Sequence, residues 1–418
     1  MAKLSQLAET LVGSEIVRLG NEINTRIKAG EKIYNYTIGD FNPKIFPIPA
    51  ALKEDIITAY NNSYTNYPPA DGLLELRVAV ASFIKVQEHI EYKTDEILIA
   101  SGGRPLIYSL FKTIVDKGDK VVYTVPSWNN NHYAHICEAE HCIIETTPEN
   151  NFMPTVEDIK NNIANATLIC LCTPQNPTGT TLEANVLKQI CELVVEENKS
   201  RAEGSKKVYI MFDQMYWLLT FGKTQHHNPV SLCPEVRPYT IFIDGISKSF
   251  AATGVRVGWA LGSAPIIAKM KSLLSHMGAW APMAEQKATA GFLLKTDVIN
   301  DYLVQYRKQI EYRLTGIYEG LIKLKEKGLP IDAIAPQAAI YLTVKMDFAG
   351  KSVNGHILST QADVTNYILS EAKLAIVPFY AFGSNRSSPW YRLSIGTCNA
   401  SEINDMLSGL EAALEKIN

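Results

Sequence analysis

The chain has 418 residues, of which 46% are hydrophobic and 20% are charged, and its formal net charge is −3. This composition is typical of a globular protein, and chains longer than about 250–300 residues usually fold as more than one domain. A charge this close to neutral provides no basic surface for nucleic acid and no polycationic face for a membrane. We therefore expect a large and a smaller domain, and no nucleic-acid or membrane partner.

Polar residues interrupt every apolar run of the N-terminal sequence MAKLSQLAETLVGSEIVRLG, so we expect no signal peptide. No stretch approaches the roughly 18–20 apolar residues that a membrane helix needs. The seven cysteines lack the spacing of a disulfide framework. Cys137 and Cys142 have no matching Cys/His pair for a metal, and Cys170 and Cys172 lie in an apolar run. We expect reduced, mostly buried thiols in a cytoplasmic protein.

The first two-thirds of the chain alternates strand and helix patterns. Apolar residues at helical intervals predict a helix over 14–29, and residues 34–39 read as a short strand. Further strands are predicted at 96–100, 120–125, 166–172, 207–213 and 239–245, with helices at 106–118 and 132–139 between them. The polar run 196–207 is expected to be a solvated connection. Strands that alternate with helices predict an α/β fold with a mainly parallel sheet covered on both faces.

From about residue 265 the pattern becomes helical. A long helix is predicted over about 297–327, with Arg307, Lys308, Glu311 and Arg313 facing solvent. Residues 331–348 and 374–396 look like strands of a smaller α+β unit, and residues 402–417 form an amphipathic C-terminal helix. We therefore expect a large domain of residues 47–296 and a small domain formed by residues 1–46 and 297–418.

Several predicted strands end in polar clusters, and ligands of open α/β sheets bind beyond the carboxyl ends of the strands. Gly103 and Arg104, in SGGRP, stand where a helix start could bind an anion, although a plain turn has the same composition. Trp128 could stack on a flat ligand or lie in the core. Asn176 lies in TPQNPTG, where two prolines and a glycine could fix the loop and orient the amide side chain toward a ligand. Alternatively, Asn-Pro is simply the start of a turn.

Two later strands end in groups with clearer chemistry. Asp213, with Tyr216 three residues on, would be a costly buried carboxylate unless it is paired, and a helix N-cap is the alternative. Lys248 follows Ser247 directly after an apolar strand and is a candidate Schiff-base amine, although most lysines lie on the surface. Arg256 could hold a phosphate. An anion cradle, a stacking ring, oxygen and nitrogen partners and an amine together match one cofactor, pyridoxal 5'-phosphate.

The same residues carry a resemblance to a known family. From Gly39 to Arg392 the chain resembles the class I/II aminotransferases among the fold-type-I pyridoxal-phosphate enzymes, and within them it is aspartate-aminotransferase-like. The motifs are Tyr67, Gly72 and Leu76-Arg77; the loop Asn176-Pro177-Thr178-Gly179; the pair Asp213 and Tyr216; Ser247-Lys248 with Arg256; and Arg392 in YRLSIGT.

By that resemblance, Lys248 carries the cofactor as a Schiff base and moves the proton during catalysis. Asp213 keeps the pyridine nitrogen protonated, Asn176 and Tyr216 bind the phenolic oxygen, and Trp128 stacks on the ring. Arg392 binds the substrate α-carboxylate, with the Gly39 backbone beside it. The phosphate lies among the residues Gly103, Arg104, Ser247 and Arg256.

The resemblance also implies a homodimer, because Tyr67 would reach the phosphate of the other subunit. The chain departs from the family pattern at Gly245, where a serine is frequent, so one phosphate hydroxyl is missing. A second departure is Ala338, in Pro336-Gln337-Ala338, where glycine is usual. These departures bear on the pocket walls rather than on the cofactor chemistry.

Arg104 is the residue that informs substrate choice. In one aspartate-aminotransferase subgroup the matching position holds a lysine that meets the distal carboxylate of the substrate, and arginine is a stronger bidentate partner. This favours aspartate or another dicarboxylic amino acid, with a 2-oxo acid such as 2-oxoglutarate as co-substrate. Alternatively, Arg104 only neutralises the phosphate. His276, near Trp280, is a weaker candidate for the same role.

Other functions remain open at this point. An aromatic or broad-specificity aminotransferase, or a pyridoxal-phosphate lyase, would use the same fold. A regulatory protein of this fold would carry an added DNA-binding segment, for which residues 1–30 are too few. No G-x-G-x-x-G follows the first strand and no Walker lysine motif is present. The histidines form no H-E-x-x-H metal motif, and His226-His227 is expected in an exposed loop.

Overall fold

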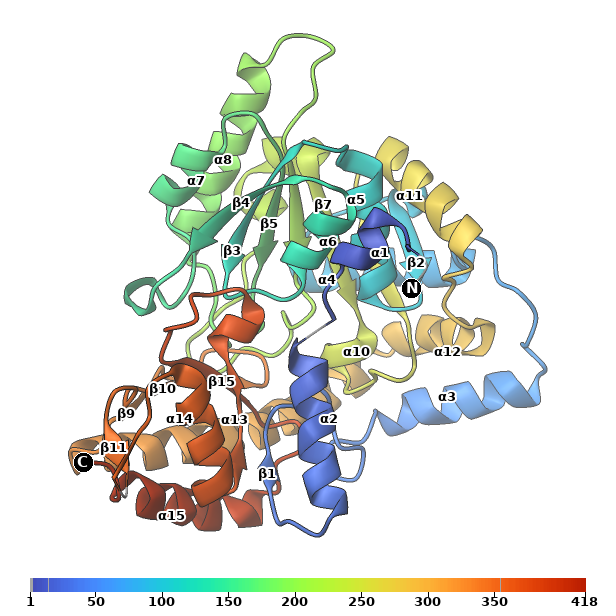
Figure 1. The fold of residues 1–418 in the computed structure, drawn as a ribbon. Coiled ribbons are helices and arrows are strands. Elements are labelled where there is room, and N and C mark those ends of the chain that lie inside the picture. Colours follow the sequence, from blue (N-terminus) through green and yellow to red (C-terminus); the bar gives the residue numbers. More distant parts are fainter. Residues whose placement is uncertain (1–2, 14, 354) are drawn as a thin grey trace.

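The structure is a computed structural model that describes residues 3–13, 15–353 and 355–418. Its centre is a seven-stranded sheet in the order β2–β8–β7–β6–β5–β3–β4 (Figure 1). Neighbours from β7 to β4 pair in parallel, whereas β8 is antiparallel to both β2 and β7. The predicted, mainly parallel sheet is confirmed. The strands are β2 (Ile97–Ala100), β3 (Lys120–Val125), β4 (Glu140–Glu145), β5 (Ala166–Cys172), β6 (Tyr209–Asp213), β7 (Thr240–Gly245) and β8 (Gly258–Leu261).

Helices cover both faces of this sheet. Successive side chains of a strand point to opposite faces, and here both faces are apolar and must be buried. In β2, for example, Ile97 and Ile99 belong to one buried cluster, whereas Leu98 and Ala100 belong to the other. One face packs against α5 (Gly103–Ile114), α6 (Asn130–Ile136) and α11 (Ala264–Met277). The other face packs against α3 (Ala50–Asn61), α4 (Leu74–Glu88), α7 (Val156–Asn162), α8 (Ala184–Ser200) and α12 (Met283–Leu293).

A second sheet, of four strands in the order β14–β15–β10–β9, lies in the C-terminal part of the chain. Its strands are β9 (Ile331–Ala333), β10 (Tyr341–Met346), β14 (Val377–Pro378) and β15 (Trp390–Ser394). The accompanying helices are the long α13 (Thr296–Glu326), α14 (Gln361–Tyr367) and α15 (Ile403–Leu414). Two separate sheets support the division into residues 47–296 and residues 1–46 with 297–418, and these boundaries stay a prediction.

An N-terminal segment and a C-terminal segment of the chain lie side by side in the lower part of Figure 1. Strand β1 (Tyr34–Asn35) pairs in parallel with β13 (Leu374–Ala375). Two helices precede it, α1 (Gln6–Thr10) and α2 (Glu15–Lys28). The minor elements are a hairpin of β11 (Ser352–Val353) and β12 (His356–Ile357), with the short helices α9 (Pro229–Leu232) and α10 (Ile246–Ser249). No helix among the described residues is long and apolar enough to cross a membrane.

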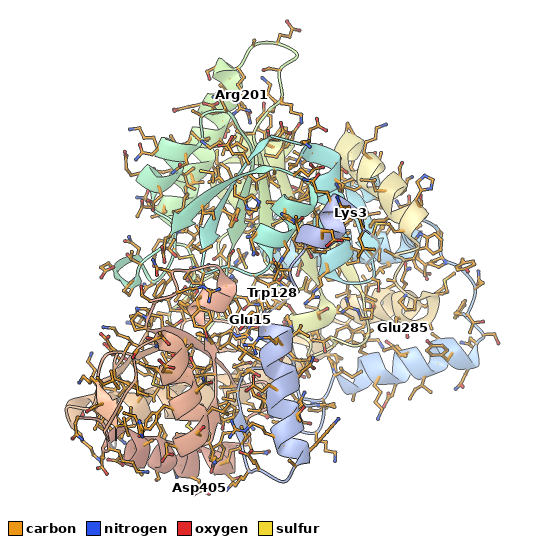
Figure 2. The ribbon with its side chains drawn as sticks, viewed as in Figure 1. Lys3, Glu15, Trp128, Arg201, Glu285 and Asp405 are labelled. Atoms are coloured by element: carbon orange, nitrogen blue, oxygen red, sulfur yellow. The ribbon has the colours of Figure 1, made fainter. Side chains whose placement is uncertain are left out.

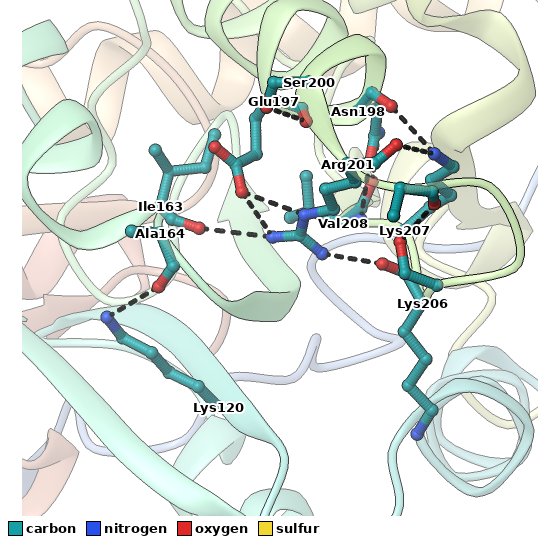
Figure 3. A network of polar contacts seen from close by, with 12 residues as sticks. Lys120, Ile163, Ala164, Glu197, Asn198, Ser200, Arg201, Lys206, Lys207 and Val208 are labelled. Atoms are coloured by element: carbon teal, nitrogen blue, oxygen red, sulfur yellow. Dashed lines mark hydrogen bonds and ion pairs between the residues drawn. The ribbon is translucent and has the colours of Figure 1, made fainter.

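Three local predictions were wrong. Only Tyr34–Asn35 of the predicted strand 34–39 is a strand, because the chain then turns into the loop that reaches the second sheet. The polar run 196–207 begins as helix, since α8 continues to Ser200. Arg201 then closes the segment by bonding Glu197 and the carbonyls of Lys206 and Ile163 (Figure 3).

The third wrong prediction concerns α13. Arg313 does not face solvent: it is buried, donates from Nε to the Cys398 carbonyl at 2.9 Å, and lies over the Phe46 ring. Arg307 is half-buried and donates to the Leu218 carbonyl at 2.6 Å. The prediction assumed an amphipathic surface helix, whose charged residues all face solvent. Because α13 packs against residues on more than one side, some of its charged residues are buried instead.

Candidate active site

A cavity of about 610 Å3 lies at the carboxyl ends of the central strands, where residues 37–40 and the second sheet meet them. Its wall brings together nearly all the site residues predicted from the sequence. These are Gly39, Gly103, Arg104, Trp128, Asn176, Asp213, Tyr216, Ser247, Lys248, Arg256 and Arg392. The parallel strands explain this convergence, because their carboxyl ends all open on the same edge of the sheet.

Lys248 stands in α10, directly after β7. Its Nζ donates a hydrogen bond to the Gly39 carbonyl at 2.5 Å. Burial lowers the pKa of Lys248 to about 8; Asp40 opposes this, and the charges of Arg392, Arg104 and Arg256 add to it. An amine with this pKa is partly neutral near neutral pH, and only the neutral form is a nucleophile.

Asp213 ends β6 and faces the cavity. Its Oδ1 accepts a hydrogen bond from the Met215 N–H at 3.1 Å, and it makes no ion pair with another described residue. Burial raises the pKa of this carboxyl to about 6, and the Met215 bond opposes the shift. A buried carboxyl without a cation is a favourable partner for a protonated ring nitrogen. The positive charge of that nitrogen would lower the pKa of Asp213 toward its ordinary value, so that the carboxyl is ionised.

One end of the cavity is built to hold an anion. The N-cap of α5 is Gly102, which has φ +81° and leaves the first N–H groups of the helix without a side-chain cap. Arg256 donates to the carbonyls of Thr253 and Ser101 at 2.7 and 2.8 Å. A Cβ on Gly102 would lie 2.2 Å from Arg256 Nη2, so this approach requires glycine.

The departure from the family at Gly245 has a steric reason. A Cβ at this position would lie 2.8 Å from the Gly258 Cα and 2.8 Å from the Val257 carbonyl oxygen, both on backbone that cannot move aside. The close pairing of β7 with β8 therefore excludes a serine here. Ser247 and Thr253 both line the cavity, so their hydroxyls belong to the same wall as Arg256.

The opposite wall carries Arg392, which is only 1% exposed. Its Nη1 donates to Asn176 Oδ1 at 3.0 Å and its Nη2 donates to the Thr37 carbonyl at 2.6 Å. Its Nε is buried without a partner, and no acidic side chain pairs with it among the described residues. A Cβ on Gly39 would lie 3.4 Å from Arg392 Nη1. A buried, uncompensated guanidinium of this kind is suited to an anionic ligand.

Tyr341 is a site residue that the sequence reasoning missed. Its hydroxyl lies 2.5 Å from the Tyr216 hydroxyl, and the Arg392 guanidinium lies over its ring at 4.7 Å. Burial, and then the neighbouring Tyr341, raise the pKa of Tyr216. Tyr341 begins β10 of the second sheet, and no local pattern marks it; its role follows from the tertiary contact alone.

Arg104 and Trp128 share a third part of the wall, where the guanidinium lies 5.3 Å from the indole ring centre. Ile16, Val17 and Gly20 of α2 also line the cavity, which the sequence did not predict. Ile16 and Trp128 pack against the same buried cluster, which includes Phe382; Figure 2 labels Trp128 and Glu15, the first residue of α2. The N-terminal helix thus forms part of the cavity wall.

Two predicted residues lie outside the cavity. Tyr67 is 82% exposed and packs edge to face on Trp280 at 5.3 Å. His276 is exposed near the end of α11. In a single chain, neither residue contributes to the site.

The expectation of an exposed His226 was wrong. Its side chain is 8% exposed, lies between the rings of Phe212 and Trp217, and has Nε2 3.7 Å from Glu88 Oε2. No group of three or more metal-ligating side chains occurs in the part of the chain that the structure describes.

Comparisons with known proteins agree with this geometry. A family model for aminotransferases of class I and II matches residues 32–410. The chain belongs to this family. It is 29% identical over 419 residues to the aspartate aminotransferase of Bacillus subtilis, covering 99% of this chain and 98% of that protein. It is also 29% identical over 375 residues to a probable aspartate/prephenate aminotransferase of Rickettsia typhi, covering 88% of each.

Solved structures show the same fold. The aspartate aminotransferase of Rhizobium meliloti superposes with a TM-score of 0.91 at 24% identity, covering 100% of both chains. That of Thermus thermophilus, solved with maleate, gives 0.87 at 24% identity, covering 99% of this chain and 100% of the other. The chain is therefore a pyridoxal-phosphate-dependent aminotransferase. The cavity fits that cofactor, since it offers an amine, an anion-binding helix start and an unpaired carboxyl.

Proposed function

We propose that this aminotransferase takes its amino group from L-aspartate or another dicarboxylic amino acid and passes it to a 2-oxo acid such as 2-oxoglutarate. The observation that carries the proposal is the presence of two cationic side chains on separate walls of one cavity, Arg392 and Arg104. A dicarboxylic substrate supplies one carboxylate for each. The names of the relatives from Bacillus subtilis and Rickettsia typhi support the same substrate class.

We assign the cofactor-holding roles as follows. Lys248 would hold the aldehyde carbon, Asp213 the ring nitrogen, and Asn176 and Tyr216 the phenolic oxygen, with Trp128 against the ring. Gly103, Ser247 and Arg256 would surround the phosphate, and Arg104 would join them in the alternative in which it does not bind the substrate. When bound, the cofactor supplies an electron sink for the pair released from the substrate α-carbon. Borohydride reduction followed by peptide mapping tests the assignment: label on any lysine other than Lys248 would contradict it.

The remaining chemistry belongs to the side chains of the protein. The α-carboxylate binds Arg392, whose Nη1 and Nη2 each donate only one hydrogen bond to the residues that the structure describes and so keep a second N–H for a ligand. This contact fixes the substrate, so that its α-carbon faces Lys248. Lys248 then takes and returns the proton, a role suited to an amine of pKa about 8.

Arg104→Ala tests the substrate assignment. Loss of one charge-assisted hydrogen bond of about 1.5–3 kcal/mol should lower kcat/KM for aspartate about 10- to 100-fold. The rate with an apolar amino acid should change little, and Arg104→Lys should recover part of the loss. Equal losses for both amino acids, with weaker cofactor binding, would instead assign Arg104 to the phosphate.

A second candidate, an aromatic or broad-specificity aminotransferase, is favoured by one observation. Ile16, Val17, Ile107 and Trp128 line the same cavity as Arg104 with apolar side chains. Half-reactions with aspartate, tyrosine and cystathionine separate the candidates, including a lyase. A rate for tyrosine that exceeds the rate for aspartate in the unmodified enzyme would make the aromatic assignment the better one.

We further propose a cytoplasmic homodimer in which Tyr67 completes the site of the other subunit. Tyr67 is exposed and lies on a surface that also exposes Tyr60, Tyr64, Leu74 and Val78 of α3, α4 and the segment between them. An apolar surface of this kind is typical of a permanent interface. All seven cysteines are free thiols, which supports a reducing compartment.

Mixed dimers test the role of Tyr67. Hybrids of a Lys248→Ala chain with a Tyr67→Ala chain contain one wholly intact site if Tyr67 acts across the interface. That site should bind cofactor with the affinity of the unmodified enzyme. If Tyr67 acts within its own chain, every hybrid site lacks one group and no such site appears.

A further inference from the structure

A buried polar cluster lies behind the cavity wall and takes no part in the chemistry assigned above. It consists of Glu88, Gln214, His226 and Asp244, with the Trp217 indole at its edge. None of these residues lines the cavity. Asp244 is fully buried and Glu88 is 6% exposed.

Hydrogen bonds of this cluster tie together the two segments that carry the cofactor-binding side chains. Trp217 Nε1 donates to Asp244 Oδ2 at 2.9 Å, and the Gly245 N–H donates to Asp244 Oδ1 at 2.6 Å. Gln214 Nε2 donates to Glu88 Oε1 at 2.5 Å. The Gln214 backbone N–H also donates to the Ile243 carbonyl at 3.1 Å. The turn after β6 and the end of β7 are thus joined by side chains as well as by backbone.

The cluster residues alternate in sequence with the residues of the cavity. Asp213 faces the cavity, and its neighbour Gln214 faces the cluster. Tyr216 faces the cavity, and its neighbour Trp217 faces the cluster. Asp244 stands four residues before Lys248. The backbone from which the cofactor-binding side chains project is therefore anchored on its far side by the cluster.

This arrangement costs stability. Glu88 is the last residue of α4, where the helix dipole disfavours a negative charge. Among the described residues, no lysine or arginine pairs with either carboxyl; the titratable groups near them are His226, at 3.7 Å from Glu88, and the Tyr92 phenol. Proteins in which apolar side chains of similar volume replace such buried charged groups are often as stable. Buried polar residues that lower stability are expected where function requires them.

Burial, and then the charge of Glu88, raise the pKa of Asp244 well above its ordinary range, against smaller opposing effects of Gly245, Trp217 and Gln214. An asparagine at position 244 would keep the acceptor for Trp217 but would place its amide nitrogen, a donor, against the Gly245 N–H.

We propose that Asp244, together with Glu88, is a positioning residue that holds segments 213–217 and 244–248 in the register that brings Asp213, Tyr216 and Lys248 to one cavity. The proposal rests on the aminotransferase site assigned above but not on the identity of the amino acid. It adds to that site a buried support whose members touch neither substrate nor cofactor.

Hydrogen–deuterium exchange of the enzyme without cofactor provides the test. In Asp244→Ala, amides of segments 213–219 and 244–250 should exchange at least about tenfold faster than in the unmodified chain. Asp244→Asn keeps one of the two acceptors, so its amides should exchange at a rate between those of Asp244→Ala and the unmodified chain. A matched control is Asn198→Ala, which removes buried bonds to Val208 at the other end of β6 (Figure 3). The control should leave both segments unchanged.

Kinetics of the cofactor-loaded enzyme provide the second readout. Per loaded site, kcat should fall at least about tenfold in Asp244→Ala, with KM within about threefold, and Asp244→Asn should restore part of the loss. If Asp244→Ala does not fold, Trp217→Phe, which removes the donor to Asp244, should speed exchange in segment 244–250.

Three results would overturn the proposal: exchange in both segments no faster than in Asn198→Ala, unchanged kcat per loaded site, or Asp244→Asn as damaged as Asp244→Ala. Inactivity of the unmodified enzyme toward aspartate would bear only on the substrate, because the exchange experiment uses neither cofactor nor substrate.

Discussion

Arg392→Lys keeps the charge in the carboxylate-binding wall and removes the planar fork. In the structure Arg392 donates one Nη1 proton to Asn176 Oδ1 and one Nη2 proton to the Thr37 carbonyl. The second proton of each Nη remains for the ligand. A lysine can offer the α-carboxylate a point charge but not two parallel hydrogen bonds. The loss of one or more charge-assisted bonds should cost about 2–4 kcal/mol of transition-state binding, so kcat/KM should fall about 30- to 700-fold.

The assay compares substrates that do and do not carry the group in question. Half-reactions followed by cofactor absorbance should show the loss with aspartate, glutamate and tyrosine alike. A primary amine without a carboxylate should react at a low rate that the substitution leaves unchanged. Because Arg392 is a buried charge without an acidic partner, Arg392→Met should not lower the thermal unfolding midpoint. Equal loss for the carboxylate-free amine would refute the assignment.

Three further outcomes follow from the site. Gly102→Ala places a Cβ against Arg256, so the affinity for pyridoxal phosphate should fall at least about 100-fold. The affinity for pyridoxal, which lacks the phosphate, should stay within about threefold. Fluorescence titration measures both affinities, and equal losses would contradict the anion site. In the cofactor-free chain the unfolded state binds the Lys248 proton more tightly than the folded state does, so stability should rise with pH between about 8 and 10.5. Lys248→Met should remove this rise in urea unfolding, and a parallel pH dependence in the variant would contradict the lowered pKa. Tyr341→Phe should shift the pH midpoint of the cofactor absorbance by removing the hydroxyl bonded to Tyr216; an unchanged midpoint would reduce Tyr341 to packing.

The polar clusters at the strand ends could be found from the sequence because an apolar strand followed by polar residues is a pattern of neighbouring residues. A buried strand must be apolar, so Asp213 or Lys248 at its end stands out, and parallel strands open on one edge. The alternation of strands and helices likewise predicted the central sheet. The resemblance to the aminotransferases rested on the same short segments, and the family match confirmed it.

Contacts between distant segments could not be predicted in this way. Tyr341 meets Tyr216 across 125 residues, and Gln214 meets Glu88 across 126. Arg313 looked like a solvent-facing charge on a helix until a second unit covered that face. His226 likewise resembled a loop histidine and is buried against Glu88.

The sequence by itself determined which chemical groups the site contains, because residue type and strand periodicity are local properties of the chain. Only the tertiary structure decided their surroundings: which charges are buried, which carboxyls have a raised pKa and which arginine lacks an acidic partner. Those properties depend on solvent exclusion and on distances between segments far apart in the chain, and neither exists before the sheets and helices pack.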